Sequence, residues 1–166
     1  TNVAWTAASD SDDPTRMGIA PGVKLIDIKV STGGPDDQQV LAYEFIKSLI
    51  QNPQEHGLDE SIHISAINLS LGTKSINDDS YREKTQSQLL AELWNDHEVV
   101  NVAAAGNRFK CYDSEQGVDF PGSDRHTISV GAIHHQSGDS KTYSEENLCS
   151  AESGERFADR ITSYSQ

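Results

Sequence analysis

The sequence predicts an α/β fold with a doubly wound parallel sheet. Short runs rich in β-branched residues alternate with longer segments of helical periodicity, and turn residues separate them. The resulting order of strand, helix, strand, helix, strand is typical of βαβ units, whose right-handed crossovers place helices on the faces of a parallel sheet. The 166 residues are enough for one domain with a single core.

The spacing of apolar residues predicts the first strand and the first helix. Residues 24–30 (KLIDIKV) alternate between polar and apolar side chains, as a half-buried strand does. Residues 36–37 (DD) can cap the N-terminus of a helix over residues 38–50. Three apolar residues form one face of that helix, which we expect to be buried: Leu41, Phe45 and Leu49.

The remaining chain predicts three more strands and a second helix. A strand is expected over residues 63–71 (HISAINLSL), and Ser80 with Glu83 has the spacing of a capping box that opens a helix. Further strands are expected over residues 99–105 (VVNVAAA) and 127–133 (TISVGAI). Four residues of the second helix are expected to be buried: Leu89, Leu90, Leu93 and Trp94.

The charge of the chain opposes binding to nucleic acid. It has 26 acidic and 13 basic side chains, which gives a formal net charge of -13, and binding to phosphate backbones needs Lys and Arg to replace counterions. A hydrophobic content of 35% is typical of a globular protein. No stretch approaches the roughly 20 apolar residues that span a bilayer, and the six histidines show no metal-ligand spacing. We therefore expect no nucleic acid, membrane or catalytic metal as a partner.

Two long connectors interrupt the alternating pattern, and each contains one cysteine. Residues 108–126 contain Cys111 and residues 134–160 contain Cys149. The two cysteines match no zinc-binding spacing. They are either two unrelated buried thiols or a disulfide that tethers both loops, and a disulfide would imply an oxidising compartment. The sequence leaves both interpretations open.

Two segments at the expected carboxyl ends of strands have the features of a peptide-binding site. Residues 68–72 (NLSLG) end the second strand, and residues 103–107 (AAAGN) end the third. Ligands of open α/β sheets bind at this edge, where small residues let another backbone approach closely. Asn107 after Gly106 adds a neutral amide donor that can stabilise an oxyanion. On its own, each segment is also typical of a tightly packed strand that ends in a turn.

The order of four segments resembles that of the subtilase family of serine proteases. They are GIAPGVKL at 18–25, INLSLG at 67–72, VVNVAAAGN at 99–107 and FPGSDRHTISVGAI at 120–133. Residues 1–5 (TNVAW) resemble the remainder of the family's H-G-T-H-V-A-G motif. Residues 161–165 (ITSYS) resemble the strand shortly before its G-T-S-M-A nucleophile segment. The resemblance spans nearly the whole chain, with residues 138–159 as a loop insertion.

The resemblance implies roles for seven residues. Asn107 matches the side-chain donor of the oxyanion hole. Two groups match the segments that hold the substrate backbone and line the pocket for the residue before the scissile bond: Ser70, Leu71 and Gly72, and Ala104, Ala105 and Gly106. The family implies peptide or protein substrates and a secreted or other extracytoplasmic location. No cofactor is expected for the chemistry, whereas structural calcium is compatible with the acidity of the chain.

The chain also departs from the family pattern. Asn2 and Trp5 replace the second His and the final Gly of the first motif, and no D-T/S-G, H-G-T-H or G-T-S-M-A segment occurs. Because base, orienting acid and nucleophile work as a unit, we expect this segment alone to be inactive. It is interpreted as the central part of a larger subtilisin-like endopeptidase, and on its own it is expected to self-associate or to need companion fragments. A peptide-binding pseudoenzyme is the alternative, and a flavodoxin-like domain is disfavoured because no phosphate-binding turn follows the first strand.

Overall fold

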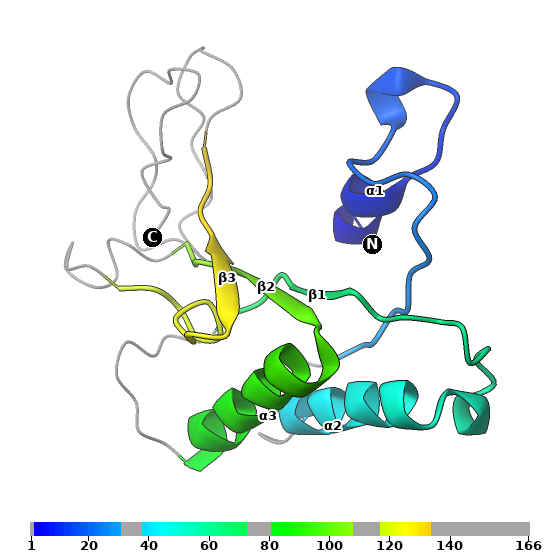
Figure 1. Ribbon diagram of the computed structural model, residues 1–166. Coiled ribbons are helices and arrows are strands. Elements are labelled where there is room, and N and C mark those ends of the chain that lie inside the picture. Colours follow the sequence, from blue (N-terminus) through cyan, green and yellow to red (C-terminus); the bar gives the residue numbers. More distant parts are fainter. Residues whose placement is uncertain (1, 31–37, 73–80, 108–116, 134–166) are drawn as a thin grey trace. The chain divides into compact units, whose positions relative to one another are not determined.

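A computed structural model describes four stretches of the chain, namely residues 2–30, 38–72, 81–107 and 117–133 (Figure 1). The chain divides into two compact units, Thr1–Pro35 and Asp36–Gln166. The second unit contains the sheet and both long helices. Among the described helices, none is both long enough and apolar enough to cross a bilayer.

Several expectations concern residues outside the described stretches. These are the pairing of the two cysteines, the insertion, the resemblance near the C-terminus and the N-terminal caps of both helices. They involve Cys111, Cys149, residues 138–159, residues 161–165, residues 36–37 and Ser80. They stay predictions.

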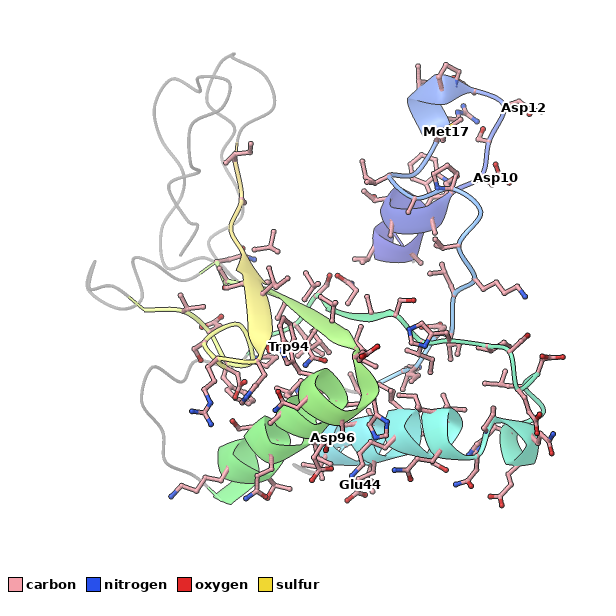
Figure 2. The ribbon with its side chains drawn as sticks, in the orientation of Figure 1. Asp10, Asp12, Met17, Glu44, Trp94 and Asp96 are labelled. Carbon is pink, nitrogen blue, oxygen red and sulfur yellow. The ribbon has the colours of Figure 1, made fainter. Side chains whose placement is uncertain are left out.

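The first unit is built around a short helix and a capped turn. Helix α1 (Asn2–Ala8) precedes the 3-10 helix η1 (Pro14–Arg16), whose N-terminal cap is Asp13. Asp13 Oδ1 accepts hydrogen bonds from the Thr15 amide at 3.0 Å and the Thr15 hydroxyl at 2.7 Å. These bonds favour the ionised carboxylate and lower the pKa of Asp13. Figure 2 shows Asp10 and Asp12 in the loop between the two helices, where both are exposed.

The strand predicted for residues 24–30 is not formed in the structure. The segment carries no strand assignment, and Leu25 and Ile26 are 56% and 45% exposed. Alternation shows which side chains could face a core, but a strand also needs a neighbour that satisfies its backbone hydrogen bonds. No described strand pairs with this segment.

Helix α2 (Gln38–Gln51) confirms the first predicted helix but buries a different face. The buried residues are Tyr43, Ile46 and Leu49. Of the face predicted from the sequence, only Leu49 is buried, whereas Leu41 and Phe45 are 59% and 43% exposed. Phe45 instead packs edge-on against His56 in the 3-10 helix η2 (Pro53–His56), with 5.2 Å between ring centroids.

Helix α3 (Tyr81–His97) confirms the second predicted helix and packs against α2. Leu89, Leu90 and Leu93 are buried as predicted. Trp94 is 38% exposed, so its predicted burial is wrong (Figure 2). The buried face of the helix includes Gln86, which lies one turn before Leu90, and it leaves out Trp94.

Three short parallel strands form the sheet, in the order β1-β2-β3. They are β1 (Ala66–Leu69), β2 (Val100–Ala104) and β3 (Thr127–Val130), each within a predicted strand but shorter than it. Figure 1 shows α2 and α3 together on one side of this sheet. The predicted α/β class with a parallel sheet is confirmed.

A buried asparagine ties the central strand to its surroundings. Asn101 of β2 is 0% exposed, and its Nδ2 donates to the carbonyl oxygens of Leu90 in α3 and His126 before β3, each at 3.0 Å. Nearby in the sequence, the buried Asp124 accepts hydrogen bonds from the Ser87 hydroxyl and from the His126 amide, the latter at 2.8 Å. These contacts fix helix α3 and the loop before β3 relative to the sheet.

Tyr43 in α2 contributes a buried hydroxyl to the same region. The residue is 2% exposed, and its hydroxyl has no hydrogen-bond partner among the residues that the structure describes. Burial raises the pKa of Tyr43 far above its ordinary value, and the negative charge of Asp124 raises it further. The phenol therefore stays protonated in the folded protein.

We expect Asn101→Ala to destabilise the full-length protein by about 2 kcal/mol. The substitution removes the two hydrogen bonds that the side chain donates to the carbonyl oxygens of Leu90 and His126. Urea unfolding measures the change. Asn95→Ala is the matched control, since Asn95 is exposed on α3 and should leave the midpoint unchanged. Equal midpoints for the two variants would contradict the bridging role.

We expect Tyr43→Phe to raise the free energy of unfolding by about 1 kcal/mol at neutral pH, because it removes a buried hydroxyl that has no partner in the described part of the chain. The folded-state pKa lies above the unfolded value of about 10, so the wild type loses stability as the pH rises above that value, where the unfolded chain ionises its phenol and the folded protein does not. The variant should therefore lose less stability than the wild type under alkaline conditions. Tyr43→Ala controls for ring packing and should cost about 3 kcal/mol or more. A marked loss of stability in Tyr43→Phe would show that the hydroxyl has a partner.

Candidate substrate-binding site

The two predicted substrate-binding segments leave the sheet side by side. Leu69 of β1 lies opposite Ala103 of β2. Because the strands are parallel, residues 70–72 and residues 104–107 continue from the same edge, which is where open α/β sheets bind ligands. The structure therefore brings together the segments that the sequence placed in one site.

A loop that the sequence analysis did not assign to the site runs along the second segment. The backbone amide of Asp119 donates to the Ala105 carbonyl at 2.8 Å, and the Ala105 amide donates to the Val130 carbonyl at 2.9 Å. Gly122 passes so close to β2 that a Cβ atom there would lie 2.7 Å from the Ala104 carbonyl oxygen. The loop is thus held against residues 104–105 by backbone contacts.

The Asp119 side chain contacts the first segment as well. A Cβ atom at Gly72 would lie 2.9 Å from Asp119 Cβ and 3.2 Å from its Oδ2. Asp119 is only 3% exposed. Its backbone is thus bonded to Ala105 and its carboxylate lies against Gly72, so a buried acid stands between the two segments.

Asn107 lies at the exposed end of the second segment. It follows Gly106, whose φ of 116° is a conformation that L side chains rarely adopt and that turns the chain after β2. Asn107 is exposed, whereas Ala105, two residues earlier, is 3% exposed. The amide therefore lies at the rim of the site, where it can donate to a ligand.

The other predicted site residues differ in exposure. Ser70 is exposed, and its hydroxyl accepts a hydrogen bond from Asn68 Nδ2 at 2.9 Å. Four residues are half-buried: Leu71, Gly72, Ala104 and Gly106. The site combines an exposed serine, half-buried apolar residues, one exposed amide and one buried carboxylate, an arrangement that suits an extended peptide.

Asp119 was not among the residues predicted from the sequence to lie at this site. The residue directly precedes the F-P-G of the fourth family-like segment, and an acidic residue there was the available signal. Nothing in the sequence indicated that this acid would meet Gly72, because the contact joins positions 47 residues apart (119 minus 72).

Among the residues that the structure describes, no three His, Cys, Asp or Glu side chains gather in a group that could hold a metal ion. Structural calcium stays an expectation from the sequence. Trp5, which departs from the family motif, lies on α1 and is 55% exposed.

The fold is similar to that of solved proteases. It matches a structure described as the S41 psychrophilic protease with a TM-score of 0.57 and 19% sequence identity, covering 98% of this chain and 43% of the other. It matches the MycP3 protease from the type VII (ESX-3) secretion system with a TM-score of 0.51 and 22% identity, covering 80% of this chain and 42% of the other. The chain thus spans less than half the length of these structures. At these identities the likeness shows the fold.

A comparison with curated proteins gave no match. The model of the subtilase family (peptidase S8), however, matches residues 1–160. This match extends over nearly the whole chain and includes both strand ends of the candidate site. The protein therefore belongs to the subtilase family of serine proteases.

Proposed function

We propose that this chain supplies the substrate-binding cleft and the oxyanion-hole asparagine of a subtilisin-type serine endopeptidase that hydrolyses peptide bonds. The supporting observation is the placement of Asn107 beyond Gly106, at the exposed end of a segment that leaves the sheet beside residues 70–72. The family match supports the same activity class.

In this proposal the substrate backbone lies in an extended form between the two segments. Residues 70–72 pair with it, and residues 104–106 form the opposite wall, whose small side chains allow close approach. When the scissile carbonyl becomes tetrahedral, the Asn107 amide donates a hydrogen bond to the oxyanion. A neutral amide suits this role, because its N–H stabilises the developing charge without transferring the proton to the oxyanion.

The acid, base and nucleophile are proposed to come from the remainder of a longer chain. Their motifs do not occur among the 166 residues, and the three groups act as a unit. The departures at Asn2 and Trp5 favour the alternative, a subtilase-like pseudoenzyme that binds extended peptides without cleaving them.

The proposed location is secreted or otherwise extracytoplasmic, as is frequent in this family. A Cys111–Cys149 disulfide would agree with that location. If the segment exists by itself, we propose self-association or companion fragments, because Val100, Ile128 and Val130 of the sheet are 36%, 48% and 50% exposed.

We expect Asn107→Ala in the full-length protein to lower kcat by about 10²–10³, since the oxyanion loses one donor. The rate of labelling by a fluorophosphonate and the hydrolysis of a peptide library measure the effect. Asn95→Ala removes an exposed amide from α3 and is the matched control.

Three outcomes separate the alternatives. Slow labelling of Asn107→Ala, with normal labelling of Asn95→Ala, supports the proposal. Equal rates for both variants would show that Asn107 is not the oxyanion donor. A folded full-length protein that never labels but binds peptides would establish the pseudoenzyme.

A further inference from the structure

A short loop before β3, residues 119–126, contacts the second segment of the candidate site. The Asp119 amide donates to the Ala105 carbonyl at 2.8 Å. At Gly122 the backbone lies so close to Ala104 that a Cβ atom would approach the Ala104 carbonyl oxygen to 2.7 Å. The position of residues 104–105 therefore depends on the position of this loop.

Backbone hydrogen bonds hold the loop in a compact turn. The Ser123 amide donates to the Asp119 carbonyl at 3.0 Å, and the Asp124 amide donates to the Pro121 carbonyl at 3.0 Å. The Thr127 amide at the start of β3 donates to the Asp124 carbonyl at 3.1 Å. The bonds join residues three or four positions apart, as in a turn of helix. Because the turn is bonded internally, a displacement at Asp124 is transmitted to Asp119.

The side chain of Asp124 attaches this turn to helix α3. One carboxylate oxygen accepts a hydrogen bond from the Ser87 hydroxyl on α3, and the other accepts one from the His126 amide at 2.8 Å. The Asp124 side chain is only 4% exposed, and hydrogen bonds to a charged group in such surroundings are stronger than those at a surface. Ser87 and Asp124 thus form a side-chain link between α3 and the turn.

We propose that Asp124 is a positioning residue for substrate binding, which holds residues 104–105 in place through the turn that it links to Ser87. This inference rests on the proposed function, in which these residues line the pocket for the residue before the scissile bond. Asp124 acts indirectly, since its carboxylate is bonded to α3 and to its own loop, and other residues of the turn contact the pocket wall.

The test measures kcat/KM of the full-length protein for peptides that differ only at the residue before the cleaved bond. The readout is the ratio between the best-cleaved side chain of a peptide library and glycine, which has no side chain to contact the wall. A variant that merely folds less well leaves this ratio unchanged, because the same active molecules cleave both peptides. We expect Ser87→Ala to lower the ratio by about 2- to 30-fold, the range for coupling through a network of contacts.

Ser48→Ala is the matched control for Ser87→Ala. Ser48 on α2 is also half-buried, and its hydroxyl is also hydrogen bonded to a side chain, with 2.8 Å between Ser48 Oγ and His56 Nε2. The His56 side chain belongs to η2 and not to the turn before β3. Ser48→Ala should therefore leave the ratio unchanged.

Variants of Asp124 assign the effect to the link itself. Asp124→Ala should lower the ratio at least as much as Ser87→Ala does. The double variant should be no worse than Asp124→Ala alone, because both substitutions break the same link. Asp124→Asn keeps an acceptor for the His126 amide and provides a donor for the Ser87 oxygen, so it should restore most of the ratio.

The outcomes distinguish this inference from the proposed function. Equal ratios in Ser87→Ala, Ser48→Ala and the wild type would overturn the inference while cleavage continues. A double variant in which the two fold-losses multiply would also overturn it, since the contacts would then be independent. If Asp124→Ala fails to fold, the comparison of Ser87→Ala with Ser48→Ala decides alone. If the protein binds peptides without cleaving or labelling, the proposed function fails, and the same ratios measured as calorimetric affinities decide whether Asp124 positions the wall.

Discussion

Backbone hydrogen bonds between β1 and β2 align Leu69 with Ala103, and the position of the candidate site depends on this register. In a parallel pair both strands end at the same edge, so one alignment brings residues 70–72 and residues 104–107 together. A shift by one residue would turn the side chains of either segment to the other face of the sheet. The loop that carries Asp119 extends the same arrangement, because its amide bonds to Ala105 just beyond the sheet.

A second set of interactions connects the central strand β2 to α3 and to the loop before β3. Asn101 is the buried residue of β2 that contacts both α3 and the chain before β3. Asp124 joins the loop to Ser87 of α3. Buried polar groups stabilise a fold when they find partners, and the partners of Asn101 and Asp124 come from α3 and the loop before β3. The core thus holds the helix, the central strand and the site loop in one arrangement, while the site itself stays at the edge.

The sequence predicted the helices more reliably than their buried faces. Helical periodicity is local, so α2 and α3 lie where they were expected. Which face of a helix is buried depends on the element that packs against it. In α2, which packs against α3, Tyr43 is buried and Leu41 is exposed. Phe45 packs against His56. Trp94 is exposed for the same reason: its position relative to the core is decided by tertiary packing.

The part of the candidate site that is formed by residues at the ends of the strands could be predicted from the sequence. Small residues followed by Gly106 and Asn107 are a local pattern, and parallel pairing places it next to residues 70–72. The position of Asp119 between the two segments was not predictable, because it depends on a contact with Gly72 across a long sequence separation. The strand expected at residues 24–30 is not formed, because an alternating pattern of polar and apolar residues does not by itself provide a strand to pair with.

The most direct test of the central claim is a crystal structure of the full-length protein labelled with a peptidyl fluorophosphonate. The account predicts an extended peptide between residues 70–72 and residues 104–106, with the phosphoryl oxygen about 3 Å from Asn107 Nδ2. A peptide bound away from these two segments, or a phosphoryl oxygen that is held by other donors, would contradict it.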